Sequence, residues 1–405
     1  MWTLTEETQM EFRNLTPFSV MEYAMDDKLD ERHRVVAMKT GFRLMQDAGG
    51  QWHTQLMENP ALPLCMEDEF SGEMNLSPVL RESDLAPLKP ACDIIVNGTA
   101  YTPGGIAAPE MTVGVLMRAP SGDVLLNKKL RITGQRFYRC QAVTGQWYET
   151  EPEPFTSLPL DYRYAFGGEC RVSTNSEYAK LIPDEFRLTE VQRGEHPDKD
   201  NPPLAHTVCP VNPVGLGYTH PWYLQTCKIQ QLEAPRIIAV DSPFTLQHFT
   251  DLLDDNADWF APAFQPAGFG CISRTWLPRL LLAGAYDQEW LETQHPGLPD
   301  DFDFGYWNCA PHDQQILYPE PGPEFVLSGF RPEGDIHFTL PAHQGRILLR
   351  LPTGQRIPMP MWLDTIEINT DALTVAQTWR FLLPGSSPVR VMEARYRTRS
   401  AQDGR

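Results

Sequence analysis

Short apolar runs that alternate with polar residues recur along the chain and predict a protein built mainly from β-strands. The clearest pair lies at 112–138, where TVGVLMRAP leads through a Ser-Gly-Asp turn into VLLNKKLRITGQRFY. In the second run, Leu130 and Ile132 alternate with charged or polar neighbours, which is the period of a strand buried on one face. Two such runs joined by a short turn predict a β-hairpin.

Further strands follow from the same pattern. Buried strands are expected where apolar runs end at turn-forming residues, and the 37 prolines and 28 glycines favour many short strands over long helices. The expected strands cover 34–45, 93–101, 334–341 and 345–352, with a last hairpin formed by 362–371 and 372–384.

Helical signals are confined to the region 240–295. Ser242 followed by Pro243 is typical of a helix start, and the apolar residues after it fall on one face. A second short helix is expected over 286–292. The predicted fold class is therefore mainly β, sandwich-like or barrel-like, with many short strands, long loops and two or three short helices around 240–295.

The length of 405 residues predicts either one large domain over 1–384 or two tightly packed β-rich halves, 1–145 and 146–384. The charged stretch EVQRGEHPDKDNPP at 190–203 is expected to be a mobile loop. Residues 385–405 are polar and lean basic, so we expect a flexible tail.

Charge limits the partners that the protein can have. The formal net charge is −19, which argues against nucleic acid as the main partner, because binding it requires a basic surface. An acidic surface suits solvation or a partner with basic patches. The first residues do not resemble a signal peptide, and no apolar run reaches about 18 residues. We therefore expect a cytoplasmic protein whose eight scattered cysteines are reduced.

The stretch 266–315 carries the densest candidate chemistry. It combines Trp, Tyr and Phe side chains with many prolines and paired carboxylates, which suits neither a solvated linker nor a regular helix or strand. A glycosidase would use two carboxylates flanked by aromatic sugar platforms. A structural interpretation instead makes Asp300 and Asp301 the caps of a turn after Pro299, and the aromatic residues packed rings. The candidate carboxylates are Asp300, Asp301 and Asp303, and the candidate platforms are Trp290, Tyr306 and Trp307.

Other candidate motifs are incomplete. His206 and Cys209 have the spacing of half a zinc site, but no second close pair accompanies them. His312 and Asp313 are adjacent, which does not suit the usual pairing of a base with its orienting carboxylate. The glycine-rich stretch 212–220 lacks the spacing of a phosphate-binding loop and predicts a turn. No catalytic set, metal or cofactor is predicted.

A protein-interaction surface explains the stretch 266–315 as a third alternative. Aromatic residues, Arg and Met are enriched at the centres of protein interfaces. An unusual core in a large β-protein would contain the same residue types, so the residues alone leave both alternatives open.

Several long stretches, in order along residues 15–384, resemble a family of type VI secretion proteins regarded as effector-loading adaptors or chaperones. The matching stretches are VVAMKTGF (35–42), SDLAPLKPACDIIVNGTAYTPGG (83–105), ITGQR (132–136), PFTSLPLDYRYAFGG (154–168), NPVGLGY (212–218), PAGFGCISRTWLPRLLLAGAYDQEW (266–290), LPDDFDFGYWNCAPHDQQI (298–316) and DTIEINTDALTVAQTWR (364–380).

The resemblance implies a non-catalytic adaptor that binds a secreted effector, often one with a PAAR-like domain, and helps to mount it on the VgrG spike. It implies neither a cofactor nor a membrane or nucleic-acid partner. The alternatives are a hydrolase that uses the three aspartates and a structural component of the secretion apparatus. The residues expected to form or support the binding surface are Trp276, Arg279, Tyr286, Trp290, Asp301, Tyr306 and Trp307.

Overall fold

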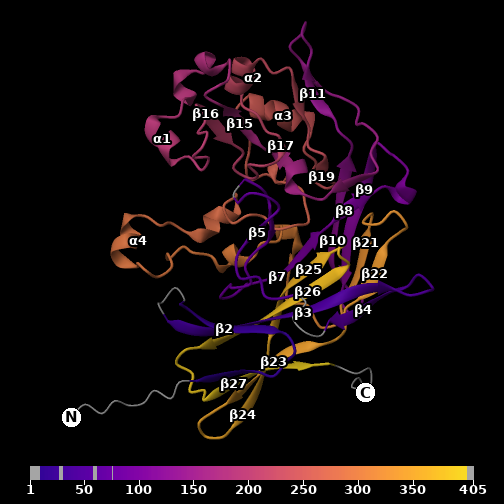
Figure 1. Cartoon of the computed structure of the whole chain (residues 1–405), viewed down its shortest axis with the longest axis vertical. Coiled ribbons are helices and arrows are strands. Elements are labelled where there is room, and N and C mark those ends of the chain that lie inside the picture. The colour runs from indigo at the N-terminus through magenta and orange to yellow at the C-terminus, as the bar shows by residue number, and fades with distance from the viewer. Residues whose placement is uncertain (1–9, 27–30, 58–61, 75, 399–405) are drawn as a thin grey trace.

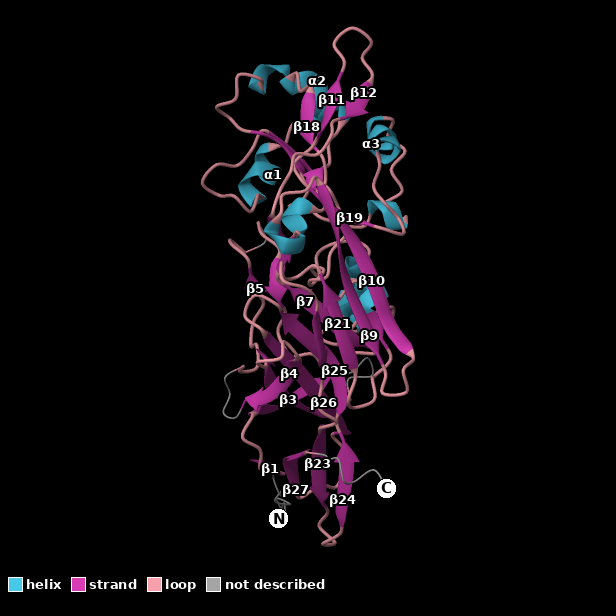
Figure 2. Ribbon diagram, turned by 90° about the vertical axis from the view of Figure 1, so that its right-hand side faces the viewer, coloured by secondary structure: helices cyan, strands magenta, loops and turns pink. Residues whose placement is uncertain are grey.

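The computed structural model describes residues 10–26, 31–57, 62–74 and 76–398 of the chain (Figure 1). Strands hold 38% of the residues and helices 14%, so the predicted mainly β class is confirmed. Two large sheets form the middle of an elongated molecule, a small sheet lies at one end, and a helix-containing region lies at the other (Figure 2). No helix in the described ranges is long and apolar enough to cross a membrane.

The first large sheet is organised around β3, which matches the strand expected at 34–45. Its middle residues, 35–42, are all buried, because β3 has neighbours on both edges and cover on both faces. The last predicted hairpin is confirmed as β25 and β26, and β26 pairs antiparallel with β3. The sheet order is β2 (Ser19–Asp26), β3 (Arg32–Gln46), β26 (Thr374–Pro384), β25 (Trp362–Asn369), β7 (Cys92–Asn97) and β20 (Gln315–Ile316), and β4 (Trp52–Met57) also pairs with β3.

The second large sheet contains the predicted hairpin as β9 and β10, paired in antiparallel register. Alternate residues such as Val113, Val115, Leu130 and Ile132 join Ile366 of the first sheet in one apolar core, so the two sheets stack as a sandwich. The sheet order is β19 (Ile237–Ala239), β10 (Val124–Thr133), β9 (Glu110–Arg118), β21 (Glu324–Ser328) and β22 (Ile336–Thr339).

The third sheet corrects the expectation of a flexible tail from 385 onward. Residues 391–397 form β27, which pairs parallel with β1 and antiparallel with β23. The charged residue Glu393 is buried there because Arg350 and Arg395 approach its carboxylate at 2.6 and 2.7 Å. Residues 399–405 lie outside the described part of the chain. The sheet order is β1 (Glu11–Asn14), β27 (Val391–Arg397), β23 (Gln344–Arg350) and β24 (Arg356–Pro360).

The region opposite the third sheet has its own small apolar clusters within 138–264. Short strand pairs and helices build it, and further 3₁₀ turns are spread along the chain. The remaining strands are β5 (Glu69–Phe70), β6 (Val79–Arg81), β8 (Thr99–Tyr101), β11 (Phe137–Cys140), β12 (Trp147–Glu149), β13 (Ser157–Pro159), β14 (Phe166–Gly167), β15 (Glu169–Val172), β16 (Ala205–Val208), β17 (Leu216–Gly217) and β18 (Gln231–Glu233); the 3₁₀ turns are η1 (Pro103–Gly105), η2 (Tyr162–Tyr164), η3 (Ala179–Leu181), η4 (Asp184–Phe186), η5 (Pro262–Phe264), η6 (Arg279–Ala283), η7 (Phe304–Trp307) and η8 (His312–Gln314).

The helices agree only partly with the sequence. α3 (Leu246–Leu253) and α4 (Gln288–Thr293) lie in the predicted region, but α1 (Glu190–Glu195) and α2 (Pro221–Cys227) lie outside it. α3 begins at Leu246 rather than after Ser242, because Thr245 and His248 form its capping box. The stretch 190–203, expected to be a mobile loop, begins instead with α1, which Thr189 and Gln192 cap in the same way.

The proposed boundary at residue 145 does not separate two β-rich units. β7 from the first range pairs with β25 from the second, and β9 pairs with β21. Strands of both ranges therefore complete the same two sheets and share one core.

Candidate functional site: a projecting arm

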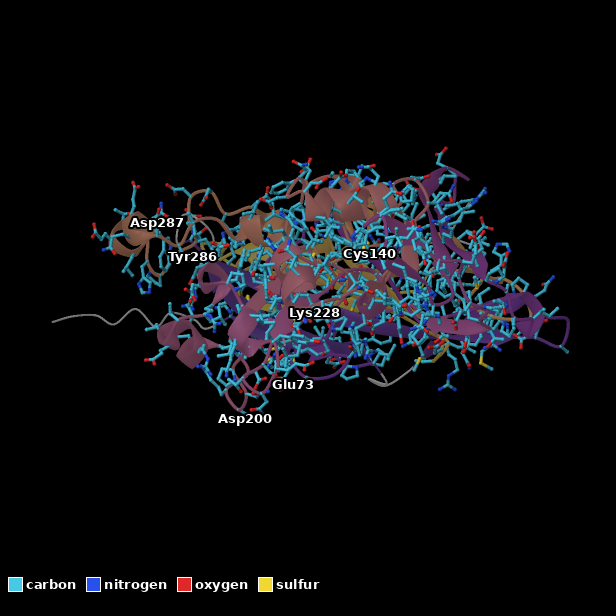
Figure 3. The ribbon with its side chains drawn as sticks, turned by 90° about the horizontal axis from the view of Figure 1, so that it is seen from above. Glu73, Cys140, Asp200, Lys228, Tyr286 and Asp287 are labelled. Carbon is cyan, nitrogen blue, oxygen red and sulfur yellow. The ribbon has the colours of Figure 1, made fainter. Side chains whose placement is uncertain are left out.

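Residues 279–307, which we call the arm, stand out from the side of the molecule as η6, α4 and η7. α4 lies farthest from the body, between the α1 region above and β2 below (Figure 1). Seen from above, Tyr286 and Asp287 lie at the projecting end (Figure 3). The arm falls within the stretch that the sequence singled out for its aromatic and acidic residues.

Arg279 anchors the base of the arm. Its Nη1 and Nη2 atoms donate to the two carboxylate oxygens of Glu82 at 2.6 and 2.8 Å, and the guanidinium also donates to the carbonyl oxygens of Ile272 and Tyr306. Burial alone would lower the pKa of Arg279, but the adjacent Glu82 carboxylate outweighs it and raises that pKa. The pair is almost fully buried, so every donor and acceptor in it must be matched.

Neighbouring side chains extend this base. Trp276 is buried, and its ring meets that of Tyr162 edge to face at 5.6 Å between centroids. Arg274 pairs with Asp68 at 2.9 Å. Its guanidinium carbon also lies over the ring of Trp307, 5.9 Å from the ring centroid. The base is therefore fixed by both packing and charge.

The two sides of the arm are held together by short contacts that involve the candidate carboxylates. Asp301 Oδ1 accepts from the backbone N–H of Ala285 at 3.0 Å, and Asp303 Oδ1 accepts from that of Gly305 at 2.7 Å. The backbone N–H of Asp303 donates to the Leu282 carbonyl at 2.8 Å. Asp303 therefore caps η7, whereas Asp301 joins the two sides of the arm. The structural interpretation of the sequence instead expected Asp300 and Asp301 to cap a turn after Pro299.

The tip of the arm folds around Trp290. Asp287 caps α4 by accepting from the backbone N–H of Trp290 at 2.9 Å. The indole N–H of Trp290 donates to the Gly297 carbonyl at 2.9 Å, and the ring of Tyr286 meets the indole at 4.7 Å. These contacts give the tip a defined shape without a core of its own.

The outer surface of the arm combines apolar and acidic side chains. Four large apolar side chains are exposed, Leu280 by 43%, Leu281 by 58%, Tyr286 by 53% and Leu291 by 53%. Between residues 280 and 303 the chain has six carboxylates and no lysine or arginine. The six acidic residues are Asp287, Glu289, Glu292, Asp300, Asp301 and Asp303, all of them exposed.

The seven residues expected at a binding surface therefore have different roles. Trp276 and Arg279 are buried, so they support the arm and do not face solvent. Tyr286 and Asp301 are exposed, whereas Trp290, Tyr306 and Trp307 are partly buried. The sequence placed all seven in one region, but it missed Leu280, Leu281 and Leu291, because nothing in an apolar triplet or a short helix shows that its leucines face solvent.

The other sequence candidates do not assemble into a reactive centre. Cys209 is buried in an apolar cluster, which raises its pKa to about 12. His206 contacts Glu169 instead, and no cluster of metal-ligating side chains occurs in the described ranges. Asp313 pairs with Lys128 at 2.8 Å. The glycine-rich stretch is a turn, as predicted, held by the Asn212 side chain, which donates to the Phe166 carbonyl.

A histidine relay that the sequence did not indicate joins β15 and β16 to the segment after α1. His196 Nε2 lies 2.9 Å from His206 Nδ1, and His206 Nε2 lies 2.8 Å from Glu169. His196 Nδ1 accepts from the backbone N–H of Asp198 at 3.0 Å. Burial, and then the neighbouring His206, lower the pKa of His196, so its neutral form is favoured.

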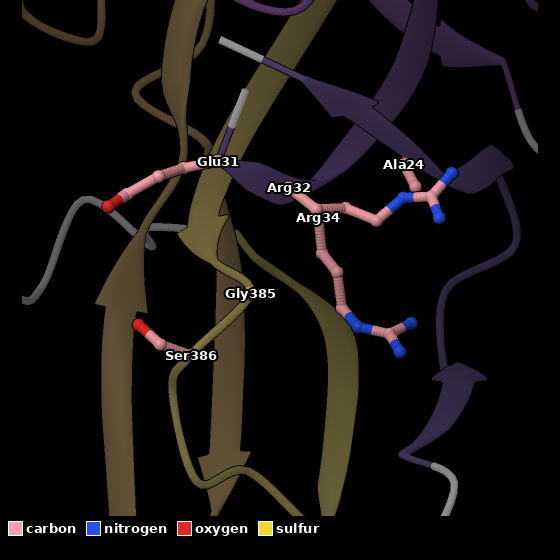
Figure 4. Close-up of a pocket in the computed structure, with 6 residues that line it drawn as sticks. All are labelled: Ala24, Glu31, Arg32, Arg34, Gly385 and Ser386. Atoms are coloured by element: carbon pink, nitrogen blue, oxygen red, sulfur yellow. The ribbon is translucent and has the colours of Figure 1, made fainter. Parts of the chain in front are cut away.

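Two surface hollows complete the survey. One of about 500 Å³ is lined by Arg32 and Arg34, whose guanidinium groups point to the same side (Figure 4). These arginines pair with Asp26 and Glu22, so their charges are compensated. A second hollow, of about 450 Å³, lies beside the stacked rings of Phe186 and Trp222. The apolar and acidic arm therefore remains the most distinctive surface.

Comparison with known proteins places most of the chain in one family. A model of a bacterial family matches residues 30–380, and its description reads "Uncharacterized protein conserved in bacteria (DUF2169)". No curated protein and no solved structure matches the chain. The match spans the second large sheet, the whole arm, and the first large sheet except for β2 and the end of β26.

Proposed function

The chain belongs to the bacterial DUF2169 family, and from that premise we propose that it is a non-catalytic adaptor or chaperone for a type VI secretion effector. In this proposal the protein binds the effector, which carries a PAAR-like domain, and helps to load it onto the VgrG spike. It acts in the bacterial cytoplasm before secretion. The long ordered resemblance along residues 15–384 supports this assignment.

The exposed apolar surface of the arm is the observation that carries the proposal. Large apolar side chains cost free energy when they remain in water, and a projecting element that displays several of them is typical of a protein-interaction site. The buried Arg279–Glu82 pair fixes the base of that element. A preorganised surface loses less conformational entropy on binding, which favours affinity.

The contacts of Asp301 and Asp303 do not favour the hydrolase alternative. Each carboxylate accepts a backbone N–H of the arm itself, which stabilises the turns there. A glycosidase needs two carboxyl groups that face each other across the sugar, whereas these two carboxylates are engaged by the arm's own backbone.

Gene deletion with quantitative proteomics of the culture medium tests the proposed function. Loss of one effector from the medium, while the tube protein of the secretion system is still released, is the expected result. Unchanged delivery of every effector would overturn the proposal. Stoichiometric recovery of the protein in assembled particles would instead assign it to the apparatus as a structural component.

A further inference from the structure

The arm offers apolar side chains surrounded by negative charge, and this combination specifies the chemistry of what it binds. Single exposed leucines are common on protein surfaces and need no explanation. Here Leu280, Leu281, Tyr286 and Leu291 are exposed within twelve consecutive residues of one projecting element. Burying them against a partner would remove apolar area from water, which is the main source of binding free energy at interface centres.

The acidic residues of α4 are available for such a partner. The Asp287 carboxylate caps α4, and the Glu292 carboxylate accepts a hydrogen bond from the Gln288 side chain. Glu289 is exposed to solvent. None of these three forms an ion pair within the described part of the chain. No lysine or arginine occurs from 280 to 303, and the arm's one arginine, Arg279, pairs with Glu82 outside the arm.

Resting on the proposed function, we propose that the arm binds a basic amphipathic segment of the effector, in which lysine or arginine side chains flank apolar anchors. Opposite charges across an interface accelerate association and exclude wrongly charged partners. Apolar anchors supply the affinity that exposed charges alone do not. The segment is thus defined by two properties that can be varied separately.

A second copy of the chain does not satisfy the same requirements. An arm-to-arm dimer would place identical acidic surfaces opposite each other, because a two-fold interface brings the same patch from both subunits. Six carboxylates on each side would then repel one another, and like charges in contact disfavour association.

Three fluorescent peptides of about 20 residues test the proposal with the full chain in anisotropy titrations. One is an amphipathic Leu/Lys peptide, one replaces every Lys by Glu, and one replaces every Leu by Ser while keeping the Lys residues. The Leu/Lys peptide is expected to bind at least ~10-fold more tightly than either of the others. Its affinity should fall as NaCl rises from about 50 to about 500 mM, because salt screens exposed charges.

Matched variants separate the arm from the overall acidity of the protein. L280S/L281S/L291S and D287N/E289Q/E292Q should each weaken binding of the Leu/Lys peptide by roughly tenfold. Asn at 287 keeps the cap of α4, and all six positions are exposed, so both variants should fold normally. The control E190Q/E195Q/D200N removes the same charge at exposed sites on and after α1 and should bind like the parent.

Each outcome has a definite reading. Equal binding of the Ser/Lys peptide, or equal weakening by the control variant, would overturn the proposal in favour of non-specific attraction. Equal binding of the Leu/Glu peptide would overturn the basic character of the partner. A parent dimer in sedimentation velocity that the arm variants dissociate would identify a second copy as the occupant.

This experiment and the gene deletion fail independently. If no peptide binds but deletion still removes an effector from the medium, the adaptor function stands and the partner segment is wrongly assigned. If the Leu/Lys peptide binds as expected but deletion has no effect on secretion, the arm recognises basic segments in a protein with another role.

Discussion

Arg279 and Glu82 lie 197 positions apart in the chain and form a bidentate ion pair at the base of the arm. The pair joins the connection before β7 to the start of η6. Arg274 also approaches Glu82, at 3.3 Å, so the carboxylate has two cationic neighbours. The orientation of the arm therefore depends on a charged contact and not on apolar packing alone.

Replacing Arg279 with methionine should destabilise the protein by about 3 kcal/mol, because it leaves the buried Glu82 carboxylate without its main partner. Urea unfolding followed by tryptophan fluorescence measures this. The double variant R279M/E82M should recover part of the loss. R163M breaks an exposed pair with Asp161 and should cost less than about 0.5 kcal/mol. A stability of R279M equal to that of R163M would contradict the anchoring role.

Two tryptophans predicted for the same surface should respond very differently to alanine. W276A empties a buried position in the main core and should cost about 3–5 kcal/mol. W290A removes the centre of the arm tip, where few buried contacts depend on it, and should cost less than about 1 kcal/mol. Hydrogen exchange in W290A should rise only within the arm. Global loss of protection in that variant would show that the tip supports the body.

Acid should loosen the segment after α1. The pKa of His196 is lowered in the folded chain, so the unfolded chain binds more protons once the pH falls through about 6.5. The free energy of unfolding therefore decreases as the pH falls. The hydrogen bond from His206 lowers the pKa of Glu169, so the stability contributed by that carboxylate is lost only below about pH 4.5, at more acidic pH than the change due to His196. Exchange protection of 196–201, corrected for intrinsic rates, should decrease several-fold between about pH 7.5 and about pH 5.5.

The reason is the arrangement of hydrogens in the relay. With Nδ1 of His196 accepting from Asp198, Nε2 must donate to His206, which then donates to Glu169. A further proton on His196 would sit on Nδ1 and place its N–H against the backbone N–H of Asp198. H196Q removes the group with the lowered pKa and should flatten the pH dependence of this segment. An unaltered profile in H196Q would assign the effect to other groups.

Thiol labelling should follow burial. All eight cysteines are free, but only Cys140 and Cys227 are partly accessible. Burial raises the pKa of Cys65 to about 12 and that of Cys170 to about 11, so little reactive thiolate forms there at neutral pH. Iodoacetamide with mass spectrometry should modify Cys140 and Cys227 first. Equally rapid labelling of Cys271 or Cys309, which are buried and 3.3 Å apart, would contradict the packing around them.

Local patterns could be read from the sequence, whereas distant pairings could not. The hairpin of β9 and β10 was predictable because its strands and turn are adjacent in the chain. The strand β27 was not, since its partners are β1 and β23 and its polar sequence hides a buried Glu393. Arg350 and Arg395 balance the charge of Glu393 and so make its burial possible. No local sequence pattern indicates these pairings.

The same reasoning applies to the arm. Its aromatic and acidic composition was visible in the sequence, and a turn-capping role for Asp300 and Asp301 was among the alternatives. The cap that Asp303 provides for η7 was not predicted. The anchor to Glu82 was not visible, because it joins segments 197 positions apart. Leu281 is exposed, whereas the nearby charged residue Arg279 is buried. This is the opposite of the usual distribution, and it is possible because the charge of Arg279 is paired at the base of the arm.

The antiparallel pairing of β3 with β26 also sets when this protein can fold during synthesis. The middle of the first sheet forms only after residues 374–384 have been translated and can pair with residues 32–46. Residues 47–373 are translated in between, so β3 lacks its pairing with β26 during that time. Closing so long a loop slows folding, and an apolar strand with an unpaired edge is prone to aggregate. A delay in translation between residues 46 and 374 should therefore lower the yield of folded protein more than a delay of the same length before residue 32.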